Sequence, residues 1–221
     1  MLYRAQNSNT VTLLIVLILV ITLSIVSSDA IAQDISTSPR YFKVSGVASD
    51  DILNARANPD SSAVIVGKLV HNASRVEVFR EQSGWAQVAL DENMGWVSMR
   101  FLTEIKVSNI GKSTLPEGLS CGGTEPFWGL AISGSQIRYS SMDQSERTYA
   151  ITEADRFHNL GGSTNFVLAQ GSDEQLTAII SNQICSDGMS DRDYPRRIDL
   201  LSTKVGATIG QSGCCQVSQV R

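Results

Sequence analysis

The chain has 221 residues, with 18 Lys and Arg against 22 Asp and Glu, so its formal net charge at pH 7 is −4. A protein that binds nucleic acid through the phosphates needs the opposite balance, which excludes nucleic acid as an expected partner. Hydrophobic residues make up 42% of the chain and charged residues 18%, as is typical of a folded protein rather than a disordered one. Two histidines, His71 and His158, leave little material for acid–base chemistry near neutral pH.

The first 32 residues have the order of a secretory signal peptide. Arg4 precedes sixteen uncharged residues, 11–26, and the small residues at Ala30-Ile31-Ala32 predict cleavage after Ala32. We therefore expect a signal peptide at 1–32, an N-terminal tether at 33–40, and a periplasmic or secreted mature protein. The alternative is an inner-membrane protein anchored by residues 11–26, although a spanning helix usually needs about 20 apolar residues.

Residues 106–118, KVSNIGKSTLPEG, lose the hydrophobic period of their neighbours and collect Gly, Ser, Pro and Lys. This composition predicts a linker. It separates a half without cysteine from a half that holds all four cysteines. We expect one domain at 41–105 and a second at 119–217.

The first half reads as short strands separated by turns. The segments are rich in β-branched or aromatic residues, and several alternate apolar with polar positions. They are residues 41–44, 53–56, 64–69, 76–79, 85–90 and 95–97. No helical period of ten or more residues interrupts them, so we expect a small all-β barrel.

Four motifs in this half resemble the bacterial SH3 domain, over residues 41–104. They are Leu53-Asn54-Ala55-Arg56 with Pro59, Gly67 to Leu69, Gly84-Trp85 with Val88, and Gly95-Trp96-Val97 with Phe101-Leu102. The chain departs from the family pattern at Asn58 and Asn72, where Gly is usual. Asn tolerates the left-handed backbone better than other non-glycine residues, so we expect that conformation at both positions. The resemblance implies an SH3-like β barrel.

The second half is also rich in strands. The expected strands are residues 127–133, 136–140, 147–152, 165–170, 175–184, 197–202 and 205–210. Residues 153–157 are compatible with a short helical turn. A second small β barrel or sandwich is the simplest interpretation, which makes the fold class all-β with two small domains.

Three strings in this half resemble an exported bacterial family of unknown function. They are Cys121-Gly122-Gly123-Thr124-Glu125-Pro126-Phe127-Trp128, Cys185-Ser186-Asp187-Gly188-Met189-Ser190-Asp191 with Tyr194-Pro195, and Gly213-Cys214-Cys215. The family carries C-x-G-T-E-P-F-W, C-x-D-G-M-S-D-x-x-Y-P and G-C-C in this order. The resemblance spans residues 121–215 and implies export. It implies no activity, because none is established for the family.

An even number of cysteines in an exported chain predicts two disulfides. Cys214 and Cys215 are adjacent, and a bridge between neighbours forms a strained ring, so we expect each to reach a distant partner. Two connectivities stay open: Cys121 with Cys214 and Cys185 with Cys215, or Cys121 with Cys215 and Cys185 with Cys214. A zinc site and a redox centre are alternatives, but the chain has no C-x-x-C spacing.

Bacterial SH3 domains often accompany cysteine-dependent cell-wall hydrolases, which need a cysteine nucleophile and a downstream histidine base. Cys121 with His158 is the candidate pair, but a bridged cysteine cannot act as a nucleophile. Four acidic residues offer oxygen ligands for calcium, yet no Asp-x-Asp-x-Asp-Gly loop is present, so solvated turns are the simpler interpretation. These residues are Glu125, Asp187, Asp191 and Asp193. We expect no catalytic residues, no metal and no cofactor.

The sequence therefore predicts a non-catalytic protein of the cell envelope. Its SH3-like domain is expected to bind a cell-wall peptide or glycan, as in peptidoglycan binding, or an envelope protein. The candidate contact residues are the aromatics Tyr41, Phe79, Trp85, Trp96 and Trp128. Closing the hydrophobic core is the competing interpretation for Trp85 and Trp96, and for Trp96 it is the favoured one. The alternative functions are an inhibitor of an envelope hydrolase such as lysozyme and the cysteine-dependent hydrolase. We expect the protein to contact a membrane only if the signal peptide is not cleaved and anchors the chain.

Overall fold

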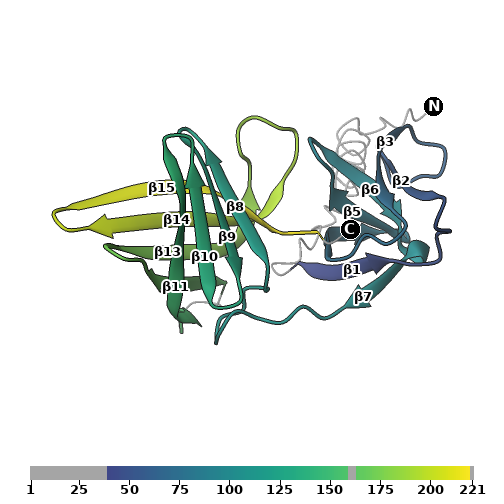
Figure 1. The fold of residues 1–221 in the computed structure, drawn as a ribbon. Coiled ribbons are helices and arrows are strands. Elements are labelled where there is room, and N and C mark those ends of the chain that lie inside the picture. Colours follow the sequence, from purple (N-terminus) through teal and green to yellow (C-terminus); the bar gives the residue numbers. More distant parts are fainter. Residues whose placement is uncertain (1–38, 159–162, 220–221) are drawn as a thin grey trace, which may run out of the picture. The chain divides into compact units, whose positions relative to one another are not determined.

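The computed structural model describes residues 39–158 and 163–219 (Figure 1). The expected signal peptide, nearly all of the tether, and the alternative anchor at 11–26 lie outside these residues. Within the described ranges, no helix combines the length and the apolar character needed to cross a bilayer. All described residues belong to one compact unit, residues 35–221.

The first half forms a seven-stranded antiparallel sheet in the order β3-β2-β6-β5-β4-β1-β7. Its strands are β1 (Arg40–Val44), β2 (Ile52–Arg56), β3 (Ile65–Val70), β4 (Val76–Gln82), β5 (Trp85–Ala89), β6 (Met94–Ser98) and β7 (Leu102–Ile105), with the 3₁₀ turn η2 (Met99–Phe101) before β7. Alternate residues face inward, so Ala86, Val88 and Val97 are fully buried in one core.

The β4–β5 hairpin shows how local sequence sets the sheet register. Gln82 pairs with Trp85, and the two residues between them, Ser83 and Gly84, have φ angles of 50° and 80°. Positive φ at both central residues defines the tight turn that matches the twist of the flanking strands. Among the described residues other than glycine, Ser83 and Arg75 are the two that have a positive φ. The expectation of left-handed backbone at Asn58 and Asn72 is therefore wrong, because neither turn requires it.

The second half is a closed barrel of eight antiparallel strands, in which each strand pairs with the next and the last returns to the first. The strands are β8 (Leu119–Thr124), β9 (Phe127–Ser133), β10 (Gln136–Ser141), β11 (Gln144–Arg156), β12 (Thr164–Gln170), β13 (Glu174–Cys185), β14 (Tyr194–Lys204) and β15 (Ala207–Val217). Closure of β15 on β8 leaves no sheet edge along this seam. The structure confirms the all-β fold and selects a barrel over a sandwich.

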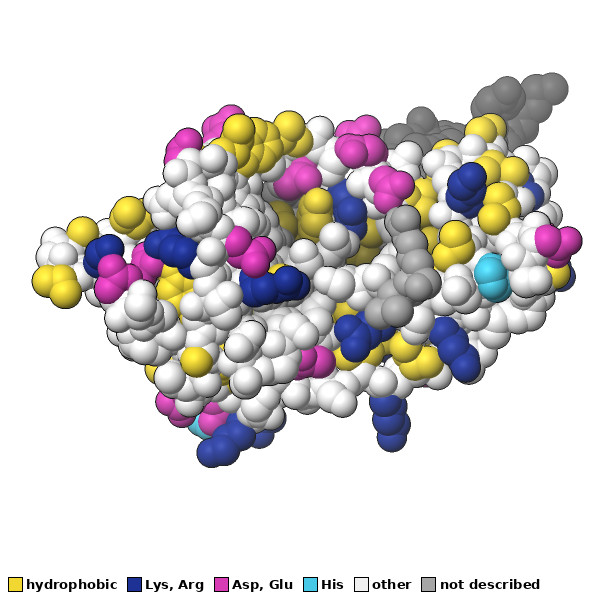
Figure 2. Space-filling model, viewed as in Figure 1, with side chains coloured by type: hydrophobic (Ala, Val, Ile, Leu, Met, Phe, Trp, Pro, Cys, Tyr) yellow, Lys and Arg dark blue, Asp and Glu magenta, His cyan; other side chains and the backbone are white. Residues whose placement is uncertain are grey.

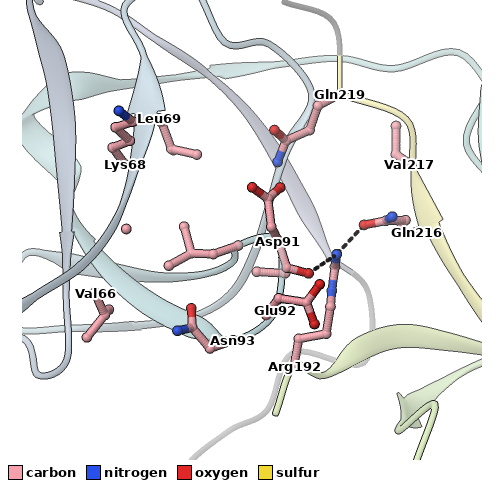
Figure 3. Close-up of a pocket in the computed structure, with 13 residues that line it drawn as sticks. Val66, Lys68, Leu69, Asp91, Glu92, Asn93, Arg192, Gln216, Val217 and Gln219 are labelled. Atoms are coloured by element: carbon pink, nitrogen blue, oxygen red, sulfur yellow. Dashed lines mark hydrogen bonds between the residues drawn. The ribbon is translucent and has the colours of Figure 1, made fainter. Parts of the chain in front are cut away.

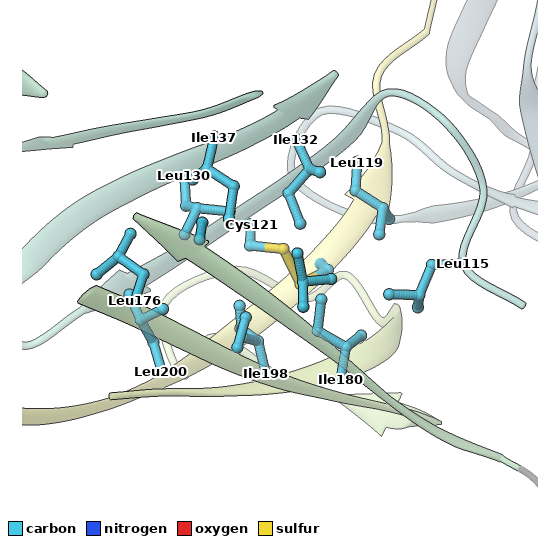
Figure 4. Close-up of a cluster of buried hydrophobic side chains, with 14 of the residues drawn as sticks. Leu115, Leu119, Cys121, Leu130, Ile132, Ile137, Leu176, Ile180, Ile198 and Leu200 are labelled. Atoms are coloured by element: carbon cyan, nitrogen blue, oxygen red, sulfur yellow. A yellow bond between two sulfur atoms is a disulfide. The ribbon is translucent and has the colours of Figure 1, made fainter. Parts of the chain in front are cut away.

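The barrel is filled by apolar residues at alternate strand positions (Figure 4). Ile132, Ile137, Ile180 and Ile198 have no exposed surface. The expected helical turn at 153–157 is wrong, because β11 continues to Arg156 and buries Ala154 opposite Val167 of β12. Packing on the barrel wall outweighs a weak local helix preference.

Residues 106–118, expected as a linker, contribute to the barrel core. Ile110 and Leu115 are 3% and 0% exposed and belong to the same cluster as the barrel side chains. The backbone N–H and the hydroxyl of Thr114 both donate to Oδ1 of the fully buried Asn165, at 2.8 and 3.1 Å. This segment therefore lies against the barrel, and the domain boundaries at 105 and 119 stay predictions.

Two disulfides cross-link the barrel, and they have the second of the two connectivities left open by the sequence. Cys121 of β8 is bonded to Cys215 of β15, and these residues are direct cross-strand partners with Cα atoms 4.0 Å apart. This bridge joins the two strands that close the barrel. Cys185 at the end of β13 is bonded to Cys214, with Cα atoms 5.6 Å apart.

Candidate binding surfaces

A groove of about 590 Å³ lies on the first sheet beside Trp85, the first residue of β5. Strand alternation places Ala86 and Val88 in the core, so Trp85 faces away from it and is half-buried. The groove is also lined by segments at 46–48, 51–54 and 98–101. Its volume falls within the range of about 300–1,000 Å³ that is usual for small-molecule sites.

Apolar surface and cationic side chains surround this groove. Ile52 is 39% exposed, and the guanidinium carbon of Arg100 lies 4.3 Å from the centre of the Phe101 ring. Arg56 holds one wall by donating to the carbonyl oxygen of Ala63 at 2.7 Å. Asp51 contributes a carboxylate to the residues that line the groove. The groove thus combines an indole, an aliphatic side chain and two guanidinium groups, which suits a ligand with apolar or sugar faces and a carboxylate.

Three of the other predicted aromatic contacts, Phe79, Trp96 and Trp128, are less accessible than Trp85. Phe79 is 7% exposed and lies at the register shift between Val78 and Arg80, where a bulge alters the direction of a strand. Trp128 is 6% exposed and stacks on Tyr139 in the barrel core, with ring centroids 6.1 Å apart.

Trp96 and Tyr41 are covered by arginine side chains. Trp96 is 7% exposed and pairs across the sheet with Gln87, and the guanidinium carbon of Arg80 lies 5.4 Å from the indole centre. The half-buried Tyr41 accepts a hydrogen bond of 2.6 Å from Arg196 of the barrel. Trp85 is therefore the candidate contact residue whose position suits a ligand.

A second pocket, of about 620 Å³, lies between the β5–β6 turn, β3 and the C-terminal end of β15 (Figure 3). Arg192 reaches into this region and donates to the carbonyl oxygen of Asp91, at 3.3 Å, and to Gln216. The described residues that line this pocket include no aromatic side chain, so the Trp85 groove is the better candidate ligand site.

The acidic residues considered for calcium form no metal site. Among the described residues, no group of three or more His, Cys, Asp or Glu has the geometry to hold a metal ion. Asp187 instead caps a turn by accepting hydrogen bonds from the backbone of Met189 and Ser190 and from the Tyr194 hydroxyl. Burial opposes ionisation of Asp187, but these hydrogen bonds prevail and lower its pKa. The solvated-turn interpretation fits this residue.

The candidate nucleophile and base do not form a catalytic pair. Cys121 is consumed in the disulfide with Cys215, while the His158 side chain is 72% exposed, with Nε2 4.0 Å from a carboxylate oxygen of Asp155. On the face shown in Figure 2, basic and acidic side chains are interspersed. This mixture agrees with the small net charge of −4.

Comparison with known families supports the interpretation of the first half. Residues 51–103 match the model of the bacterial SH3 domain, which confirms the resemblance over β2 to β7. No curated protein and no solved structure gives a significant match to the chain. The resemblance of residues 121–215 to an exported family thus stays a prediction. Two disulfides and a bacterial SH3 domain fit an extracellular or periplasmic protein.

Sequence reasoning selected Trp85 but missed the residues around it. Ile52 and Arg100 carry no periodic or motif signal that marks them as neighbours of an indole, and Arg56 belongs to the first SH3 motif without being assigned a contact role there. They come together because η2 brings residues 98–101 beside β2.

Proposed function

We propose that this chain is a non-catalytic, exported cell-envelope protein whose SH3-like domain binds a cell-wall peptide or glycan. The observation that carries the proposal is the Trp85 groove, whose lining residues 46–101 overlap the segment that matches the bacterial SH3 domain. The indole supports stacking on a sugar ring or an apolar side chain. Arg56 and Arg100 offer cationic donors to the carboxylates of a wall peptide.

The test is binding of the purified protein to cell-wall sacculi, followed by calorimetry with soluble wall fragments. We expect Trp85→Ala to weaken binding by about tenfold or more, which corresponds to about 1.4 kcal/mol. Phe127→Ala is the matched control, because Phe127 is an aromatic residue 49% exposed on the barrel. That variant should bind like the wild type.

Two results would contradict this proposal. If a folded Trp85→Ala variant binds sacculi as well as the wild type, the Trp85 groove is not the binding site. A wild-type protein that does not bind sacculi but inhibits lysozyme in a parallel assay would replace it with the hydrolase-inhibitor function.

A further inference from the structure

The two disulfides differ in access to solvent. In the Cys121–Cys215 bridge the residues are 5% and 0% exposed, and both lie in the barrel core (Figure 4). In the Cys185–Cys214 bridge, Cys214 is 4% exposed, but Cys185 is half-buried and both cysteines line a pocket of about 430 Å³. A reagent in solvent therefore has a path to one bridge and not to the other.

The pocket at this exposed bridge is where the three distinctive strings of the second half meet. Its lining comes from residues 122–125, 185–189 and 212–214, with Arg197 of β14. Gly122, Gly123 and Gly213 form part of the wall, and a Cβ at Gly213 would collide with the carbonyl oxygen of Gly122. The strings thus build a pocket around one disulfide, with glycines where the chain approaches neighbouring backbone too closely for a Cβ.

The charged side chains at this pocket are bound to other groups of the protein and do not block the approach of a thiol. Arg197 donates to Asp199 at 2.9 Å and is exposed to solvent. The Asp187 carboxylate is held by its own turn, and the Thr124 hydroxyl fixes that turn by donating to the carbonyl oxygen of Asp187 at 3.1 Å. Glu125 and Met189 are exposed at the rim, Met189 by 69%.

We propose that the Cys185–Cys214 disulfide is a site of thiol–disulfide exchange with a dithiol, while Cys121–Cys215 is a permanent structural bridge. A thiolate of the dithiol attacks Sγ of Cys185, the more exposed residue of the pair, and forms a mixed disulfide as the Cys185–Cys214 bond breaks. Cys214 leaves as a thiolate and takes a proton from water. The second thiolate of the dithiol then attacks its partner sulfur and releases Cys185. Two electrons pass to the cysteine pair, and the dithiol becomes a disulfide.

Reduction would act on the loop that follows Cys185. Residues 186–193 contact the β5–β6 turn of the first sheet, where the Asp191 N–H donates to the carbonyl oxygen of Glu92 at 3.0 Å. The Asp193 N–H also points to Sδ of Met94, at 3.4 Å. The Cys185–Cys214 bond secures the start of this loop to β15. Breaking it removes this covalent tie and loosens these contacts, while Cys185 keeps its strand pairing with Tyr194.

The first test is a time course of reduction of the full-length protein by dithiothreitol without denaturant, with thiols trapped by N-ethylmaleimide and mapped by mass spectrometry. We expect Cys185 and Cys214 to be labelled at least about tenfold faster than Cys121 and Cys215, since exchange requires access to sulfur. A parallel arm with a thioredoxin-type protein dithiol distinguishes the two sources of the dithiol. Equal rates for both bridges, or faster labelling of Cys121 and Cys215, would overturn the proposal.

The second test measures amide hydrogen exchange before and after this selective reduction. Exchange should rise in residues 186–193 and in the β5–β6 turn, while β8 and β9 stay protected. The Cys185→Ala/Cys214→Ala variant, which keeps the buried bridge, should show the same pattern without any reductant. Unchanged exchange in the loop of this variant would refute the release of the loop.

Discussion

Single residues acquire their roles here from partners that lie far away in the chain. Tyr41 looks like a free aromatic at the start of a strand, but its hydroxyl accepts a hydrogen bond from Arg196, 155 positions later. Burial raises the pKa of this hydroxyl from its ordinary 10 to about 12, although the Arg196 guanidinium favours the ionised form. Tyr41 is therefore a structural contact in the protonated state.

This shift predicts a loss of stability in alkaline solution. A group whose pKa is raised by folding stabilises the protein fully below its unfolded pKa, so the Tyr41 contribution is complete below pH 10 and is lost as the pH rises to about 12. Urea unfolding across this interval should show a steeper decline for the wild type than for Tyr41→Phe. Parallel declines would contradict the assignment, since the other tyrosines are common to both proteins.

At the scale of elements, residues 106–118 show why composition misleads. Gly, Ser and Pro lower the regularity of the segment, yet two of its apolar residues, Ile110 and Leu115, pack into the barrel. Asn165 of β12 then fixes the backbone between them through Thr114. The segment is irregular because it turns, and it is ordered because its apolar side chains are buried.

Replacing Asn165 by Ala should cost about 0.5–1.5 kcal/mol of unfolding free energy, because the part-buried hydrogen bond from the N–H of Thr114 loses its acceptor. Chemical denaturation gives the magnitude, and hydrogen exchange should rise first in residues 110–115. Thr114→Val is the comparison, since it removes only the hydroxyl donor and retains the backbone bond. An equal effect of both substitutions would show that the backbone bond contributes little.

The two disulfides should also differ in their effect on equilibrium stability. They join residues 94 and 29 positions apart, and loop-closure entropy gives about 4.7 and about 3.6 kcal/mol, respectively, as upper values. Cys121→Ala/Cys215→Ala should therefore be less stable than Cys185→Ala/Cys214→Ala by at least about 1 kcal/mol in urea unfolding. The reverse order would mean that native-state effects outweigh the entropy of the unfolded chain.

For the molecule as a whole, the decisive contact is a buried ion pair between its halves. Arg196 of β14 is 1% exposed and donates to Glu77 of β4 at 2.7 Å, while the other Glu77 carboxylate oxygen accepts the Val217 N–H at 2.8 Å. Arg196 is thus buried in the protein, unlike its exposed neighbour Arg197. A buried charge needs such partners, since desolvation without them is costly.

Arg196→Met should destabilise the protein by about 3–5 kcal/mol, because it leaves Glu77 buried and unpaired. Arg197→Met, at an exposed neighbour, should cost less than about 1 kcal/mol. The double variant Arg196→Met/Glu77→Gln should recover part of the loss, as measured by urea unfolding. If Arg196→Met behaves like Arg197→Met, this ion pair does not couple the two halves.

By itself, the sequence determined the all-β class, most strand positions, the bacterial SH3 domain and the participation of the cysteines in bridges, because these properties depend on period-two alternation, short motifs and residue counts. It missed β7 and β8, whose strand pattern is weak. Only the tertiary structure decided that β15 closes on β8, that Cys121 pairs with Cys215, and that Arg196 rather than a ligand meets Tyr41. Each of these depends on which distant strands become neighbours, and a local pattern holds no information about that choice.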